Sequence, residues 1–187
     1  IRQVGKKDMI HNSWLPKHID KIAPLPASFP GMKDPLMTLR QFQDTFVDVA
    51  ANDLVNGGKI YGMPWLMDVK YFMYNKDMLQ QAGITDPPKT WEELANQAKT
   101  IKDKGIVEFP IIWSWNQKEG VVCDFAVLLY GNGGSFVDAS GKPAFNNEKG
   151  VQILTWMKQT IDDGLTNPSS ISSDENAVRD NFMAGQS

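Results

Sequence analysis

Apolar residues recur every three or four positions in several segments of this chain, which is the spacing of a helix that buries one face. In residues 34–55 the recurring positions are Leu36, Leu39, Phe42, Phe46 and Val49. Residues 89–105 carry stronger signals, because Thr90 and Glu93 form a capping box and Gly105 is suited to end a helix. We expect one helix in each segment, the second with an inward face of Leu94, Ala98 and Ile101.

Three further helices are expected, at residues 123–131, 146–164 and 172–185. The third is expected to be capped by Ser172 or Ser173. The spacing in the second predicts that the inward residues are Val151, Leu154, Met157 and Ile161. Between the helices, residues 108–113 predict a short buried strand and residues 133–145 an exposed hairpin. Helices that alternate with strands indicate an α/β architecture.

Residues 58–84 change character halfway along. The first half mixes Pro64 and several glycines with large apolar residues, and the second half takes helical spacing behind Asn75. Trp65, Asp68 and Tyr71 lie along this stretch, which otherwise has the composition of a segment that passes through a core. Core packing alone does not explain these three side chains.

Bulk composition restricts the class of protein. A chain of 187 residues with 42% hydrophobic content can bury a substantial core, as one large domain or as pieces of two. The net charge of -3 and the scattered lysines and arginines give no basic patch, so no nucleic acid partner is expected. No apolar run approaches the roughly 18 residues of a membrane helix. The single cysteine, Cys123, excludes an internal disulfide and is expected to be a small buried residue.

Residues suited to covalent or metal chemistry are sparse. His11 and His18 are the only histidines, and the G-x-S-x-G spacing of a serine nucleophile is absent. Neither the dinucleotide nor the P-loop glycine pattern occurs. The acidic residues of 174–180 are better explained as the first turn of a helix than as a metal site. We therefore predict no catalytic residue, no cofactor and no metal.

Tryptophan is the distinctive residue type, with six copies in the chain. Trp113 and Trp115 are two positions apart, so on an extended segment they project to the same side. Trp14 and Trp65 lie at the ends of strand-like runs, where open α/β sheets place their ligand crevice. Aromatic faces with a few polar neighbours suit sugars. Packing in a core is the competing interpretation, and it is favoured for the helical residues Trp91 and Trp156.

Several collinear motifs resemble one family. The run NGGKIYGMPW…YNKDMLQQAGI…PPKTWEELANQAKTIKDKG is similar to the central part of the family 1 extracellular solute-binding proteins of ABC importers, which include maltose-binding protein. The segments GNGGSFVDASGKPAFNNEKGVQILTWMKQTIDDGL and FMAGQS follow in the family's order. The similarity extends from near Lys6 to the last residue.

The resemblance implies an α/β fold of the class II periplasmic-binding-protein type. Such a fold has two lobes joined by hinge strands, and it would be incomplete in this chain because family members are longer. Residues 1–65 would form part of the N-terminal lobe and the first hinge crossing, and residues 66–187 most of the C-terminal lobe. A crossing strand that faces the cleft would explain the composition of residues 58–84.

The resemblance also implies a function without chemistry. The protein would capture a small solute, a sugar or an oligosaccharide, in the interlobe cleft and deliver it to the membrane permease of an ABC importer. It would be a monomer outside the cytoplasm, either periplasmic or lipid-anchored at the cell surface. The ligand contacts expected by this carry-over are Asn12, Trp14, Trp65, Asp68, Tyr71, Trp113, Trp115, Asn116 and Gln117.

Two other interpretations stay open. A carbohydrate-active enzyme would use Asp68 with Glu119 or Asp124 as a carboxylate pair, since glycosidic cleavage needs two carboxyl groups at a defined separation. Nothing in the sequence spacing favours such a pair. Alternatively, the chain is a cytoplasmic α/β domain whose tryptophans all belong to the core.

Overall fold

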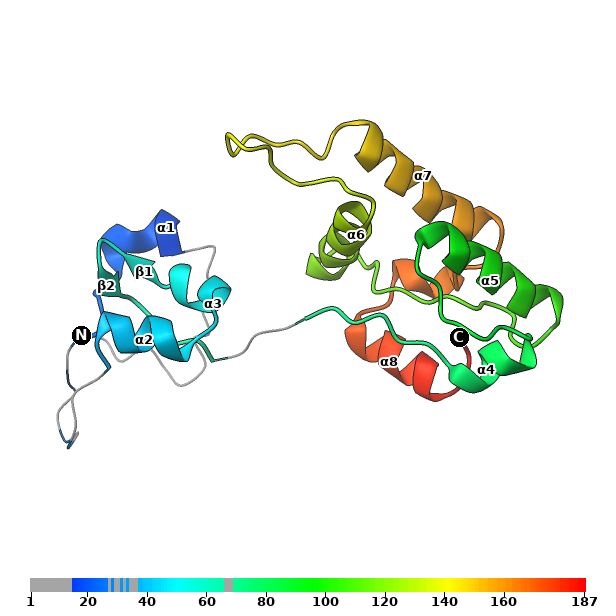
Figure 1. The fold of residues 1–187 in the computed structure, drawn as a ribbon, viewed down its shortest axis with the longest axis horizontal. Coiled ribbons are helices and arrows are strands. Elements are labelled where there is room, and N and C mark those ends of the chain that lie inside the picture. The colour runs from blue at the N-terminus through cyan, green and yellow to red at the C-terminus, as the bar shows by residue number, and fades with distance from the viewer. Residues whose placement is uncertain (1–14, 27, 29–30, 32, 34–36, 66–68) are drawn as a thin grey trace. The chain divides into compact units, whose positions relative to one another are not determined.

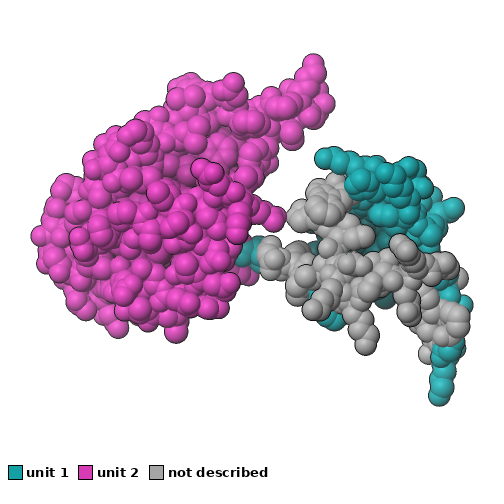
Figure 2. Space-filling model, turned by 180° about the vertical axis from the view of Figure 1, so that it is seen from behind, with its two compact units in different colours: residues 1–69 teal, residues 70–187 magenta. Residues whose placement is uncertain are grey.

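The computed structural model describes residues 15–26, 28, 31, 33, 37–65 and 69–187. The chain divides into two compact units, unit 1 at Ile1–Val69 and unit 2 at Lys70–Ser187 (Figure 2). The assignment of these units to the two lobes of a binding protein stays a prediction. Each unit is described below by itself.

The described residues of unit 1 form short elements (Figure 1). They are α1 (Leu15–His18), the 3-10 helix η2 (Ile19–Lys21), α2 (Leu39–Thr45), α3 (Asp48–Asn52), β1 (Val55–Asn56) and β2 (Lys59–Ile60). The prediction of one helix over residues 34–55 is wrong, because the backbone is extended at Phe46 and Val47 between α2 and α3. Val49 consequently lies outside, with 75% of its surface exposed, whereas Phe42 is fully buried as expected.

Local sequence explains where the elements of unit 1 begin and turn. Thr38 caps α2 through a reciprocal capping box with Gln41. The strands β1 and β2 pair with Val55 opposite Ile60, and the two-residue turn between them uses the positive φ angles of Gly57 and Gly58.

Unit 2 is mainly helical in the described residues. Its elements are α4 (Lys76–Gln81), α5 (Trp91–Asp103), α6 (Glu119–Gly131), α7 (Glu148–Asp162), the 3-10 helix η3 (Pro168–Ile171) and α8 (Glu175–Met183). The helix predicted at α5 is confirmed, with Thr90 as its cap and Leu94, Ala98 and Ile101 buried. The reciprocal half of the capping box is not formed, because the Glu93 carboxylate accepts from the Lys89 amide at 2.6 Å. The cap predicted for α8 is wrong by one or two residues, because Asp174 accepts the hydrogen bond from the Ala177 amide.

Residues 108–113, which are predicted to form a strand, belong to an extended segment that runs between the helices of unit 2. Ile111 forms an isolated parallel bridge with Thr166, and its amide donates to the Leu165 carbonyl at 3.0 Å. Trp115 continues this pairing by donating its amide to the Ser170 carbonyl at 2.9 Å. The expected hairpin in residues 133–145 is confirmed by the antiparallel bridge between Val137 and Pro143, and Figure 1 shows it projecting between α6 and α7.

The buried face of α7 differs from the predicted one. Of the four residues expected inward, Met157 is buried, whereas Val151 and Leu154 are more than half exposed and Ile161 is also exposed. The helix instead buries Gly150, Ile153, Met157 and Thr160. Gly150 lies on this buried face, and a Cβ atom there would be 1.8 Å from the Phe145 carbonyl oxygen. Apolar residues occupy two neighbouring faces of α7, so periodicity alone could not select the inner one.

Candidate functional site

Six of the predicted ligand contacts can be located in the structure. Asn12, Trp14 and Asp68 lie outside the described residues. Trp65 and Tyr71 are the most exposed aromatic side chains among the described residues of their segment, at 81% and 75%. They flank the boundary between units 1 and 2 in the sequence.

Trp113 and Trp115 form a stacked pair, which agrees with the prediction that they project to the same side. Their ring centroids are 5.4 Å apart and their planes differ by 7°. Trp115 is buried with Leu128, Ile153 and Met157, and Trp113 is half-buried against the same cluster. Trp113 also meets the edge of the Trp156 ring at 6.2 Å. The pair is therefore anchored in the core of unit 2, with Trp113 the more accessible member.

The two stacked indoles differ from the helical tryptophans in their hydrogen bonding. Trp91 donates its ring N–H to the Leu128 carbonyl at 3.2 Å, and Trp156 donates to the Trp91 carbonyl at 3.1 Å. The ring N–H groups of Trp113 and Trp115 are buried, and no acceptor among the described residues meets them. The sequence-based preference for core packing at Trp91 and Trp156 agrees with the half-buried positions of these two side chains.

Asn116 and Gln117 follow the stacked pair and lead into α6. Asn116 is half-buried and donates its backbone N–H to the Ser173 carbonyl at 3.3 Å, whereas Gln117 is exposed. Their side-chain amides offer both donors and acceptors. The structure thus brings Trp113, Trp115, Asn116 and Gln117 together on one segment, next to η3 and α8.

A charged cluster that the sequence did not indicate lies beside this segment. Lys70 Nζ is 3.1 Å from Asp124 Oδ1, 3.1 Å from Ser114 Oγ and 3.4 Å from Glu175 Oε1. Asp124 Oδ2 accepts from the Ser114 amide at 3.0 Å and from the Ser114 hydroxyl at 2.9 Å. Both Asp124 and Ser114 are buried. These residues come from four separate parts of the sequence, so no local pattern could have revealed them.

Charge and burial act against each other in this cluster. Burial opposes the charge of Lys70, but the hydrogen bond and the charge of Asp124, supported by Glu175, outweigh it and raise the pKa of Lys70.

Burial, followed by the nearby charge of Glu119, raises the pKa of the Cys123 thiol. Cys123 is half-buried, so the expectation of a buried residue is only partly met.

The cluster bears on the carboxylate pair considered for an enzyme. Asp124 has one oxygen on Lys70 and the other on Ser114, and its side chain is 9% exposed. A carboxylate held in this way is committed to structural contacts.

Among the described residues, no group of three histidine, cysteine or acidic side chains is arranged to hold a metal. None of the helices they form has both the length and the apolar character needed to cross a bilayer.

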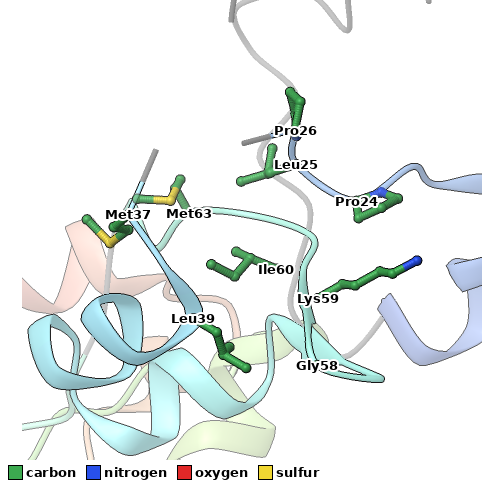
Figure 3. A pocket seen from close by; sticks show the side chains of 9 residues that line it. All are labelled: Pro24, Leu25, Pro26, Met37, Leu39, Gly58, Lys59, Ile60 and Met63. Atoms are coloured by element: carbon green, nitrogen blue, oxygen red, sulfur yellow. The ribbon is translucent and has the colours of Figure 1, made fainter. Parts of the chain in front are cut away.

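A separate apolar hollow of about 340 Å³ lies within unit 1 (Figure 3). Its walls come from the loop before residue 27, the start of α2 and the β2 region, and they are formed by Pro24, Leu25, Pro26, Met37, Leu39, Gly58, Lys59, Ile60 and Met63. None of the six predicted ligand contacts that the structure describes lines it.

Comparison with known proteins gives a consistent result. The family model described as bacterial extracellular solute-binding protein matches residues 7–187. A probable ABC transporter-binding protein of Deinococcus radiodurans is 34% identical over 148 residues, which are 76% of this chain and 34% of that protein. A probable amino-acid ABC transporter periplasmic-binding protein of Sinorhizobium fredii is 27% identical over 132 residues, covering 69% and 30%.

The solved structures point the same way. The maltose-bound MalE3 protein of T. maritima superposes with a TM-score of 0.65 at 28% identity, over 76% of this chain and 37% of that one. The chain thus spans about a third of the length of each of these three proteins.

Proposed function

Because this chain belongs to the bacterial extracellular solute-binding protein family, we propose that its full-length protein is the solute receptor of an ABC importer. The predicted periplasmic-binding-protein-like fold class is confirmed, over part of that fold, by the likeness to MalE3. Members of this family are binding proteins of transporters, and the family description implies a location outside the cytoplasm. The solute class, the permease partner, the monomeric state and the absence of catalysis are parts of the proposal.

We propose that the solute is a sugar or an oligosaccharide. The observation that carries this assignment is the exposure of Trp65 and Tyr71, which flank the boundary between the units. Exposed aromatic rings gain free energy when a ligand or a partner covers them. The C–H face of a sugar ring packs well on such a surface, and Asp68, between the two in the sequence, would accept from hydroxyl groups.

Unit 2 would supply the second group of contacts. Trp113 is the accessible ring and Trp115 backs it, so a solute would meet a surface whose position is already fixed. Asn116 and Gln117 would complement hydroxyl groups through their amides. Fixing the binding groups in advance lowers the ordering cost of association. Asn12 and Trp14 are proposed as contacts from unit 1.

The mechanism proposed is binding followed by closure. A solute that contacts both units favours a closed state over an open one by the difference in its affinity for the two states. Hinge closure of this kind is a common response of two-domain receptors, and the closed form would be presented to the permease. No covalent step is needed. The commitment of Asp124 to Lys70 and Ser114 argues against its use in a glycosidase pair.

An amino acid is the second candidate solute, because a relative carries that description. The test is a thermal-shift panel on the full-length gene product with maltose, maltotriose, arabinose and several amino acids. A ligand that binds the folded state and not the unfolded state raises the unfolding midpoint, by an amount that grows with the logarithm of its concentration above the dissociation constant. We expect an increase with at least one sugar. An increase with amino acids alone would overturn the sugar assignment, and new reducing ends after incubation with oligosaccharides would overturn binding without catalysis.

A further inference from the structure

Lys70 connects the start of unit 2 to the segment that carries the stacked tryptophans. It is the first residue of unit 2, and its ammonium contacts Ser114 and Asp124 at 3.1 Å each. Ser114 lies between Trp113 and Trp115 in the sequence. An ion pair near the unit boundary is therefore linked through a single residue to both indole rings.

Ser114 is held from three directions. Its amide donates to Asp124 Oδ2 and its hydroxyl contacts both Asp124 and Lys70. Its carbonyl oxygen lies so close to Gly120 that a Cβ atom at Gly120 would be 2.6 Å away. Because the amide and the carbonyl of Ser114 are both restrained, the backbone directions into the flanking tryptophans are restrained as well.

The contacts of Lys70 also affect Tyr71. Side chains that follow one another along an extended chain point to opposite sides. Lys70 points toward Ser114 and Asp124, and the 75% exposure of the adjacent Tyr71 agrees with the opposite direction. Because these contacts hold Lys70, they also restrain the backbone that carries the adjacent Tyr71.

Removal of the Lys70 ammonium would disturb the contacts of the buried residues Asp124 and Ser114. Asp124 is 6% exposed, and without Lys70 its carboxylate would keep only the Ser114 donors among the residues that the structure describes. A buried carboxylate that loses its countercharge is strongly disfavoured, and it gains solvation by moving toward water. Asp124 can move only if its hydrogen bonds to Ser114 break or if Ser114 moves with it. Either change alters the backbone that carries Trp113 and Trp115.

We propose that Lys70 is a positioning residue, whose contacts with Asp124 and Ser114 set the orientation of the Trp113–Trp115 pair and of Tyr71. The inference rests on the proposed function only in the statement that these rings contact a solute. The orientation of the rings is a property of unit 2 and is measurable without any solute.

The test uses the full-length protein labelled with 5-fluorotryptophan, whose fluorine resonances are assigned with Trp113→Phe and Trp115→Phe. In Lys70→Met, the resonances of Trp113 and Trp115 are expected to shift and broaden. Lys70→Arg keeps the charge and should restore most of the original spectrum. Lys99→Met is the matched control, because it removes the exposed pair of Lys99 with Asp103 by the same chemical change. It should leave both resonances in place.

A second variant keeps the proposal testable if Lys70→Met does not fold. Ser114→Ala removes the hydroxyl contacts but keeps the backbone bond to Asp124, so it should give smaller shifts in the same two resonances. If Lys70→Met and Ser114→Ala lower the unfolding midpoint but leave both resonances unchanged, Lys70 is only a stabilising residue and the proposal is overturned.

Maltose titrations separate this inference from the proposed function. If the wild-type protein binds maltose, the dissociation constant in Lys70→Met should rise about tenfold, and in Lys99→Met it should not change. An unchanged constant in Lys70→Met contradicts the positioning role in binding. If maltose does not bind the wild-type protein, the titration counts against the proposed sugar alone, and the fluorine spectra decide the role of Lys70.

Discussion

The indole rings of Trp113 and Trp115 lie nearly parallel, with an interplanar angle of 7° and a centroid separation of 5.4 Å. Parallel rings at this separation are offset, an arrangement that aromatic pairs prefer to a direct sandwich. Trp115 is 6% exposed and Trp113 is half-buried, so the two rings of one stack have different access to solvent. This asymmetry separates their expected roles.

Replacement of the two tryptophans should have different consequences. Trp113→Leu keeps an apolar side chain but loses the stacking surface, so binding of a sugar should weaken by roughly 1 to 3 kcal/mol. Trp115→Ala should instead lower the free energy of unfolding by about 3 to 5 kcal/mol, because it opens a cavity beside Leu128 and Met157. Calorimetry and urea unfolding measure the two effects. Equal affinity of Trp113→Leu and wild type would remove Trp113 from the site.

Tyr71 should affect binding without affecting stability. Its ring is 75% exposed, and Tyr71→Ala is expected to change the free energy of unfolding by no more than about 0.5 kcal/mol. Loss of a stacking ring should weaken sugar binding by roughly 1 to 3 kcal/mol. Tyr130→Ala is the control, since Tyr130 is exposed on α6 and is not a predicted contact. A similar loss of affinity in both variants would argue against a specific role for Tyr71.

Two neighbouring residues of α7 test which face is buried. Ile153 is 2% exposed and Leu154 is 56% exposed. Ile153→Ala should lower the free energy of unfolding by about 2 to 5 kcal/mol, because it leaves a cavity in the core of unit 2. Leu154→Ala should change it by about 0.5 kcal/mol or less. Urea unfolding of both variants measures the two changes. A larger loss in Leu154→Ala than in Ile153→Ala would show that the helix buries the face predicted from periodicity.

Gly150 should not tolerate a side chain. In Gly150→Ala the added methyl group would meet the Phe145 carbonyl oxygen, which is backbone and cannot rotate away. The resulting displacement of the chain should lower the free energy of unfolding by about 1 to 3 kcal/mol, despite the higher helix propensity of alanine. Lys149→Ala, one residue earlier on an exposed position, is the control. Thermal unfolding that shows a gain in stability for Gly150→Ala would contradict the close approach.

The turn at the tip of the hairpin should depend on pH in the acid range. Hydrogen bonds to Asp138 from the Ser140 hydroxyl, followed by those from the Lys142 and Ser140 amides, lower the pKa of this carboxyl group. A lowered folded-state pKa means that the turn is stabilised above the ordinary aspartate pKa and loses this support as the pH falls through the folded-state value.

Carboxyl chemical shifts in an NMR titration measure the pKa of Asp138. Ser140→Ala removes the hydroxyl donor and keeps the two amide donors, so the midpoint should move part of the way back toward the ordinary value. A midpoint that is the same in the wild type and in Ser140→Ala would show that the hydroxyl bond is not formed in solution.

Several features of the fold followed from local sequence, because their causes lie within a few residues. Thr90 accepts the amide hydrogen of Glu93 at 3.1 Å, and Gly105 has a positive φ angle just after α5. The stacking of Trp113 on Trp115 follows from their spacing on an extended segment. Family membership was likewise recognisable from collinear motifs, and the match over residues 7–187 confirms it.

Other features depended on contacts between distant residues, and the sequence carries no local sign of them. The break between α2 and α3 and the rotation of α7 were decided by packing, which chooses among faces of similar apolar content. Lys70 is 44 residues from Ser114 and 105 residues from Glu175 along the chain, so only the folded unit brings these groups together. Periodicity and capping act locally, whereas the pairing of buried charges is settled by which segments the tertiary structure places side by side.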